Sequence, residues 1–191
     1  MDFEISVKGD IDRVEKSLTR LQRREVPKAA SHALNRAAKK GRTVSTRTIA
    51  KQANIRPQRK VRDRIVVKRA TWHRLGASIR ALPRVFNLIE FVVPSKRKPG
   101  AFDTKRGVEA KAWGTKKRYP GTFIARGRGS GKPLVFVRTS SKRYPIRPVY
   151  GPSIPHEFVR RTTERAIRDA VRASFRKDFL RDLRRRINRM R

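Results

Sequence analysis

The segment from Gly107 to Pro155 constrains the fold of this chain more than any other. Its apolar and β-branched residues come in short bursts, and each burst is bounded by Gly, Pro or Ser. The bursts are Val108, Phe123 and Ile124, Leu134 to Val137, Ile146, and Val149. This pattern is typical of β-strands joined by turns. We therefore predict three or four antiparallel strands here, which form the sheet on which helices from the rest of the chain pack.

The N-terminal residues predict a short strand and a first helix. Phe3, Ile5 and Val7 alternate with polar residues, which is the period of a strand. Asp10 stands where an N-cap should, and apolar residues follow it at helical spacing as far as Leu21. We expect an amphipathic helix of about three turns.

A second helix is expected from about Pro27 to Gln52, since proline is tolerated in a first turn. Its apolar stripe consists mostly of small side chains, which let another backbone come close. Gly41 costs about 1 kcal/mol of helix propensity within it, which indicates close packing or a kink there. The expected buried stripe is Ala30, Ala33, Leu34, Ala37, Gly41, Val44 and Thr48.

The middle of the chain predicts short elements and two irregular segments. A short basic helix follows Pro57, and strands are expected around 65–67, 77–82 and 88–93. Residues 95–107 have no periodicity and are rich in basic residues, so we expect an exposed loop. Residues 126–132 hold glycines between two strand candidates and predict a hairpin turn.

A last helix is predicted to open at residues 153–155 and to continue to the end of the chain. Apolar residues run along it at helical spacing, and arginines cover its other faces. The acids among these arginines are spaced to form ion pairs one turn apart, as in Glu164 with Arg168 and Asp178 with Arg181. The expected apolar stripe is Phe158, Thr162, Ala166, Ile167, Ala170, Val171, Phe175, Phe179, Leu183, Ile187 and Met190.

Residues 1–191 show no internal repeat and no linker, so one α+β domain is expected: an antiparallel sheet with N-terminal helices and a long C-terminal helix packed on it. The chain has no cysteine, which excludes disulfides and thiolate chemistry. No segment approaches the roughly 20 apolar residues of a membrane span, and the first residues do not resemble a leader peptide. We expect no membrane partner and a protein made in a cytoplasm.

The charge of the chain is extreme. Its 52 Lys and Arg against 15 Asp and Glu give a formal net charge of +37. Self-repulsion on that scale opposes compaction unless a polyanion or an acidic partner neutralises it. The sequence therefore favours a protein that works within an assembly.

Catalysis finds little support. GRGSGK, at residues 127–132, is reminiscent of a phosphate-binding loop, but Arg126 stands where the first glycine is required and Pro133 replaces the magnesium-binding Ser or Thr. His32, His73 and His156 are scattered, and no acidic cluster suits a two-metal nuclease. We expect no enzyme activity, no cofactor, no metal and no catalytic residue.

Basic tracts are the strongest candidate sites, because so one-sided a charge is expected of contact with nucleic-acid phosphates or acidic protein faces. No motif for sequence-specific recognition is present. Aromatic residues near these tracts, with the proline and isoleucine residues beside them, are candidates for an interface with another subunit or with the rest of the assembly: Tyr119, Pro120, Phe123, Tyr144, Pro145 and Ile146. The candidate DNA or acidic-partner contacts are Arg56, Arg59, Lys60, Lys96, Arg97, Lys98, Lys105, Arg106, Lys116, Lys117, Arg118, Arg126, Arg128 and Lys132.

Several short motifs together resemble the minor tail protein Z family of lambda-like phages. They are Val26-Pro27 before an alanine-rich helix with Asn35-Arg36, then Pro120 to Ile124, Arg143 to Ile146, and Gly151 to Pro155 before a basic terminal helix. The resemblance covers about residues 10 to 190.

The resemblance implies a structural virion protein of a long, non-contractile tail, without known catalytic residues. Such a tail completion protein acts at the head-proximal end or neck and finishes the tail for joining to the head. The implied fold is similar to that of tail completion proteins, with helices on an antiparallel sheet and six copies in a ring. The implied partners are the tail terminator, the tail tube and the head-tail connector, together with the genome DNA end or the tape-measure protein.

Two other functions compete with this interpretation. A free, nonspecific nucleic-acid-binding protein, associated with a nucleoid or with ribosomes, would bind DNA or RNA tightly with a steep salt dependence. A magnesium-dependent nuclease is the third hypothesis.

Overall fold

The computed structural model describes residues 2–5, 20–93, 107–126 and 131–189, with side chains from residue 25 onward. All its strand pairs are antiparallel, and its two long helices lie toward the two ends of the chain, so the predicted α+β class is confirmed. The chain forms two compact units: Met1–Thr48, Arg62–Leu82 and Phe158–Arg191 in the first, and Ile49–Val61 and Pro83–Glu157 in the second. That residues 1–191 act as one domain stays a prediction.

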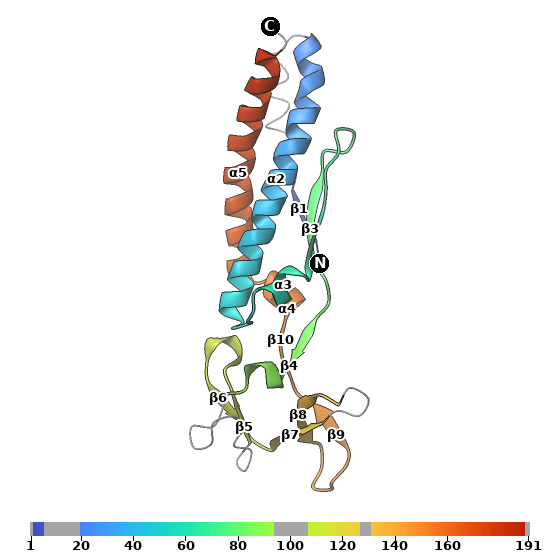
Figure 1. The fold of residues 1–191 in the computed structure, drawn as a ribbon, viewed down its shortest axis with the longest axis vertical. Helices are drawn as coiled ribbons and strands as arrows, with labels where there is room; N and C mark the ends of the chain where they lie inside the picture. Colours follow the sequence, from blue (N-terminus) through green and yellow to red (C-terminus); the bar gives the residue numbers. More distant parts are fainter. Residues whose placement is uncertain (1, 6–19, 94–106, 127–130, 190–191) are drawn as a thin grey trace. The chain divides into compact units, whose positions relative to one another are not determined.

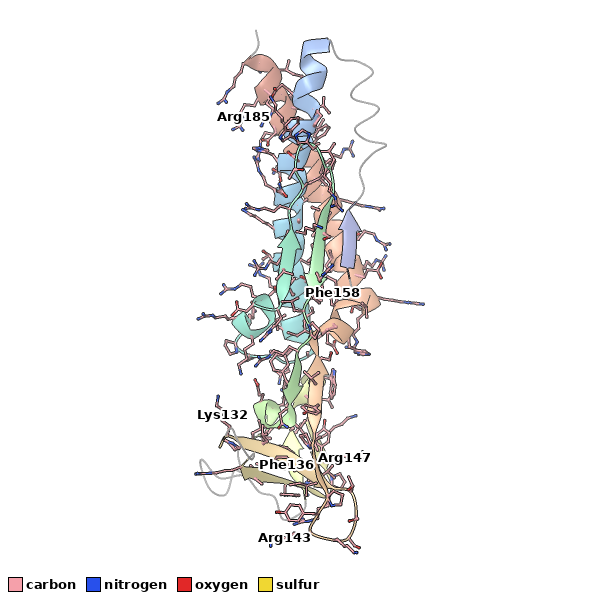
Figure 2. The ribbon with its side chains drawn as sticks, turned by 90° about the vertical axis from the view of Figure 1, so that its right-hand side faces the viewer. Lys132, Phe136, Arg143, Arg147, Phe158 and Arg185 are labelled. Carbon is pink, nitrogen blue, oxygen red and sulfur yellow. The ribbon has the colours of Figure 1, made fainter. Side chains whose placement is uncertain are left out.

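Two long helices and a three-stranded sheet build the first unit (Figure 1). Helices α2 (Arg20–Gln52) and α5 (Arg161–Asn188) run antiparallel, side by side. The sheet lies along one side of this pair, with the strand order β1 (Asp2–Ile5), β3 (Ala77–Ala81) and β2 (Ile65–Lys68). Figure 2 views the sheet with the helices behind it.

The first unit's core lies between the helices and one face of this sheet. Along β3, the buried residues Ala77, Ile79 and Ala81 alternate with two more exposed residues, which is the period of a sheet covered on one face. A Cβ atom at Gly41 of α2 would lie 2.6 Å from Ile79 Cδ1 and 2.9 Å from Val171 Cγ2. Close packing therefore explains the glycine.

The predicted helix boundaries are partly wrong. The helix expected between Asp10 and Leu21 falls mostly on residues 6–19, outside the described residues. Helix α2 does not restart at Pro27, because it begins at Arg20 and continues through the proline. Tertiary contacts outweigh the proline here, since Val26 is fully buried and Glu25 pairs with Arg186 of α5 at 2.7 Å.

The last helix is interrupted. A short helix, α4 (Ile154–Phe158), precedes α5, and the extended backbone of Arg160 separates the two. After this break, Thr163 is buried and Thr162, which was expected in the apolar stripe, is exposed. Ile167, Val171, Phe175, Phe179 and Leu183 of the expected stripe are buried as predicted.

The second unit consists of short elements. β4 (Val85–Asn87) pairs with β10 (Tyr150–Ser153), and β5 (Val108–Ala110) with β6 (Lys117–Tyr119). A three-stranded sheet has the order β7 (Thr122–Arg126), β8 (Pro133–Arg138) and β9 (Ile146–Pro148). Three short helices accompany them: α3 (Arg59–Arg62), η1 (Leu88–Phe91) and η2 (Ala112–Gly114).

The sheet that packs against the long helices is not the predicted one. The strands between residues 107 and 155 exist and are antiparallel, but they belong to the second unit, whereas α5 and most of α2 belong to the first. Turn residues divide this segment into strands of three to six residues, which pair in three small groups instead of forming one broad sheet. The hairpin around 126–132 is confirmed by the pairing of Arg126 with Pro133, and β8 follows it where a phosphate-binding loop requires a helix.

Asn87 explains why the strand predicted at 88–93 is wrong. Its side-chain oxygen accepts a hydrogen bond from the Ile89 amide at 3.0 Å and caps η1, so that the chain turns into a 3-10 helix. The same oxygen accepts the Val135 amide at 2.9 Å, which ties η1 to β8. A second polar tie lies in this unit, where the fully buried Glu157 accepts the Trp113 indole N–H at 2.9 Å.

Candidate functional site

The candidate basic contacts that the structure describes all belong to the second unit. They are Arg56, Arg59, Lys60, Lys116, Lys117, Arg118, Arg126 and Lys132. Lys96, Arg97, Lys98, Lys105, Arg106 and Arg128, like most of the expected 95–107 loop, lie outside the described residues. The proposed contact surface thus rests on the first set.

Acidic side chains of the same unit neutralise part of that set. Lys60 forms an ion pair with Glu90. Glu109 of β5 binds Lys116 at 2.6 Å and Arg118 of β6 at 2.5 Å. These two hydrogen bonds, first that of Lys116 and then that of Arg118, hold the pKa of Glu109 below its usual value. Three of the candidate cations therefore already have a carboxylate partner within their own unit.

Other candidates are exposed to solvent. Among the described residues, no carboxylate lies within 4.0 Å of Arg56, Lys117 or Arg126, and Arg59 and Lys132 are also exposed. Arg126 and Lys132 come together at one end of the β7–β8 hairpin, where Arg126 opposes Pro133. The exposed cations of this unit are thus distributed over separate elements.

The six interface candidates differ in exposure. Phe123 is half-buried against Phe136, with ring centroids 6.2 Å apart, and the Arg138 guanidinium lies 4.6 Å from its ring. Tyr144 is 62% exposed in the loop between β8 and β9, next to Arg143, which Figure 2 labels. Tyr119 and Ile146 are half-buried, whereas Pro120 and Pro145 are exposed. That these residues form an interface stays a prediction.

Asn35 and Arg36 of α2 fasten the helix to both of its neighbours in the first unit. The Asn35 amide donates to the Ala70 carbonyl and accepts from the Ala70 N–H, each at 2.9 Å, which holds the β2–β3 hairpin on the helix. The Arg36 guanidinium donates to both carboxylate oxygens of Asp182 on α5, at 3.2 and 2.9 Å. The Asn35-Arg36 dipeptide noted in the sequence is therefore a structural clamp.

The arginines of α5 fall into two groups, although the sequence predicted only that arginines cover the outer faces of this helix. Arg181 pairs with Asp178 at 2.6 Å, and Arg186 pairs with Glu25 of α2 at 2.7 Å. The predicted pair of Glu164 with Arg168 is also present, at 2.5 Å. A second group is exposed and, within the described part of the chain, has no carboxylate within 4.0 Å: Arg161, Arg165, Arg172, Arg176 and Arg184. Their spacing along the helix is the signal that could have separated them.

A metal centre needs several His, Cys, Asp or Glu side chains close together. The described residues contain no group of three or more His, Cys, Asp or Glu side chains that could hold a metal ion. His32, His73 and His156 are all exposed. Within the described segments, no helix has the length and apolar character needed to cross a membrane.

Comparison with known proteins identifies the family. The family model described as prophage minor tail protein Z matches residues 7–190. The chain belongs to the minor tail protein Z family. A curated relative, the tail completion protein of Escherichia phage N15, is 31% identical over 151 residues, which is 79% of each chain. No solved structure matches the chain.

Membership in the minor tail protein Z family makes this chain a minor tail component of a phage virion. The match begins after β1 and covers every later element of the described fold, from α2 to α5. The resemblance inferred from Asn35-Arg36 and the later proline-containing motifs is therefore confirmed. A structural role in the tail, without turnover of a substrate, is what this family suggests.

Proposed function

We propose that the protein is a tail completion protein that acts at the head-proximal end of a long, non-contractile tail and finishes the tail for joining to the head. The observation that carries this proposal is the family match over residues 7–190, together with the name of the N15 relative. In this proposal the protein acts by contact and not by catalysis.

Copies of the chain form a ring, with six as the proposed number, next to the tail terminator, the tail tube and the head-tail connector. The net charge of +37 opposes association of copies unless anions lie close by, so the proposed ring requires a polyanion near it. Six copies around an axial channel would concentrate about six times that charge where DNA passes. The genome DNA end, or the tape-measure protein, is the proposed occupant of this channel.

Basic surfaces serve two purposes in the proposal. Some contact DNA phosphates nonspecifically, and others bind acidic faces of neighbouring neck proteins. The small paired strands of the second unit and their exposed Tyr144 and Pro145 offer a surface for such a neighbour, because exposed aromatic residues anchor protein interfaces.

Complementation tests this proposal. Particles are assembled in cells that lack the chain, and purified protein is then added to the lysate. We expect the infectious titre to rise by orders of magnitude, in proportion to added protein, because completion of the tail is the missing step. Full infectivity of particles assembled without the chain would contradict the proposal.

A further inference from the structure

A continuous stripe of arginines runs along the exposed side of α5. Its members are separated by three, four or eight residues, and residues at these separations lie on one face of a helix. Leu180, which is 41% exposed, occupies the step between the last two arginines. The outer arginine stripe is Arg161, Arg165, Arg168, Arg172, Arg176 and Arg184, all of them exposed.

The stripe retains most of its charge within the described structure. Arg168 alone among its members has a carboxylate within 4.0 Å in the described residues, namely Glu164 at 2.5 Å. The exposed Asp169 lies on the same helix but forms no such pair there. By contrast, Arg36 and Arg186, which join α2 and α5, are paired with Asp178 and Asp182 and with Glu25, respectively. The acids of this unit thus hold the helices together and leave the outer side positive.

The dimensions of the stripe suit a nucleic-acid backbone. From Arg161 to Arg184 is 23 residues, or about 34 Å at about 1.5 Å per residue. Duplex DNA carries one phosphate charge per about 1.7 Å of its axis when both strands are counted, so a duplex segment of this length contains on the order of 20 phosphates, of which the helix faces only those on one side. Packing of α5 against α2 and the sheet holds the arginine backbones in place before any ligand binds.

We infer that the outer arginine stripe of α5 is the surface through which this protein contacts the phosphate backbone of duplex DNA. This inference rests on the DNA contact in the proposed function and assigns it to a helix instead of the tracts in the second unit. Three of those tract cations are bound to Glu90 or Glu109, and the exposed ones are spread over separate elements. The stripe on α5 is continuous and mostly unpaired.

An acidic protein face is the less suitable partner. The cores of protein interfaces are enriched in aromatic residues and methionine as well as in arginine, so arginines alone do not make such a core. The aromatic side chains of α5, Phe175 and Phe179, are 3% exposed and stack on each other in the core, with centroids 5.5 Å apart. The exposed side of the helix offers mainly guanidinium groups, together with Lys177, Asp169 and one large apolar side chain, Leu180, which is a surface for phosphates and not for an apolar pocket.

Titration of the full chain with a labelled duplex of about 30 base pairs, over a range of salt concentrations, tests this inference. The stripe variant changes Arg161, Arg165, Arg172, Arg176 and Arg184 to Gln, which has a helix propensity close to that of arginine. A matched control removes five exposed cations of the second unit instead: Lys117, Arg126, Lys142, Arg143 and Arg147, each to Gln. A third variant changes the same five stripe arginines to Lys. Circular dichroism establishes that each variant is folded.

Each phosphate contact contributes about 0.9 to the slope of log K against log salt. We expect the stripe variant to lose a slope of about 3 to 4.5, with a loss of at least about 100-fold in affinity near 0.1 M salt. The control should lose less than about 1 in slope, and the Lys variant should remain close to the unmodified protein. The stripe variant and the control carry the same net charge. The comparison therefore separates direct phosphate contacts of the stripe from the effect of the molecule's overall electrostatic field.

Four results would overturn the inference. Two concern the variants: an equal loss in the stripe variant and the control, and a larger loss in the control. The others are binding of poly-glutamate that is as tight and as stripe-dependent as binding of the duplex, and absence of DNA binding by the unmodified chain. None of these results changes the outcome of the complementation assay. Recovery of titre by the unmodified protein in that assay tests the proposed function separately.

Discussion

Replacement of Arg36 by methionine should destabilise the first unit although it lowers the net charge of a strongly cationic protein. The Asp182 side chain is only 2% exposed, and Arg36 donates to both of its oxygens. The next cation, Arg185, lies 3.9 Å away. The substitution leaves the buried Asp182 carboxylate without the cation that hydrogen-bonds to it.

The magnitude follows from burial. Removal of one partner of a fully buried pair costs about 3–5 kcal/mol, whereas an exposed pair contributes at most about 1 kcal/mol. Arg36 is 38% exposed, so water screens part of the interaction. We expect a loss of about 2 kcal/mol in the free energy of unfolding. For a chain of this length that corresponds to a fall of about 4–8 °C in Tm.

Chemical denaturation of three variants provides the assay and its control. Lys39→Met removes an exposed cation one turn further along the same helix and should change stability by less than about 0.5 kcal/mol. Arg36→Met combined with Asp182→Asn should recover about 1 kcal/mol, because the stranded charge is gone. If Arg36→Met and Lys39→Met behave alike, the clamp between α2 and α5 does not contribute as described.

Three further predictions concern the same unit. Gly41→Ala should lower the free energy of unfolding by about 1 kcal/mol, since overpacking at about 1–3 kcal/mol exceeds the gain in helix propensity of about 1 kcal/mol. The double variant Gly41→Ala with Ile79→Val should lose less stability in denaturation than the sum of the losses of the two single variants. Additive costs would contradict the close contact. Asn35→Ala removes two hydrogen bonds to the β2–β3 hairpin, so hydrogen exchange at the Ala70 amide should accelerate at least about 10-fold, and unchanged protection would refute the tie. The pKa of Glu25 is held below its usual value of 4.5. The contribution of Glu25 to stability, measured as the difference in free energy of unfolding from Glu25→Gln, should therefore be constant above about pH 5 and shrink as pH falls through the lowered pKa. A difference that grows on acidification would contradict this prediction.

Local patterns in the sequence predicted the elements that have a regular period. The alternation over 77–81 gave β3, and most of the small-residue stripe of α2 is buried, with Gly41 at its closest contact. The apolar spacing of α5 also identified its buried face. These features follow from the chain itself, because the period of a helix or strand decides which side chains share a face.

Pairing between distant segments could not be read in this way. Nothing in the alternation of residues 107–155 shows that the strands pair in small groups, or that residues 2–5 and 65–81 supply the sheet for the long helices. The sequence did not predict the break before α5, because apolar residues continue across Arg160 at helical spacing. At residues 88–91 a small local signal was decisive, namely the cap that Asn87 forms on η1.

The candidate site, too, could be predicted from the sequence only in part. Counting basic residues indicated a polyanion partner but not which cations already have an acidic neighbour. Glu109 and Glu90 occupy three of the expected contacts through folding of the second unit, while the outer stripe of α5 keeps most of its charge. Ion pairing between elements, and not the density of Lys and Arg in a segment, determines which surface remains available.

Electron cryomicroscopy of intact virions can locate this chain within the particle. We expect its density as a closed ring at the junction of tail and head, with α5 lining or facing the axial DNA. Density at the distal tip of the tail, or its absence from mature particles, would show that the protein does not complete the tail at its head-proximal end.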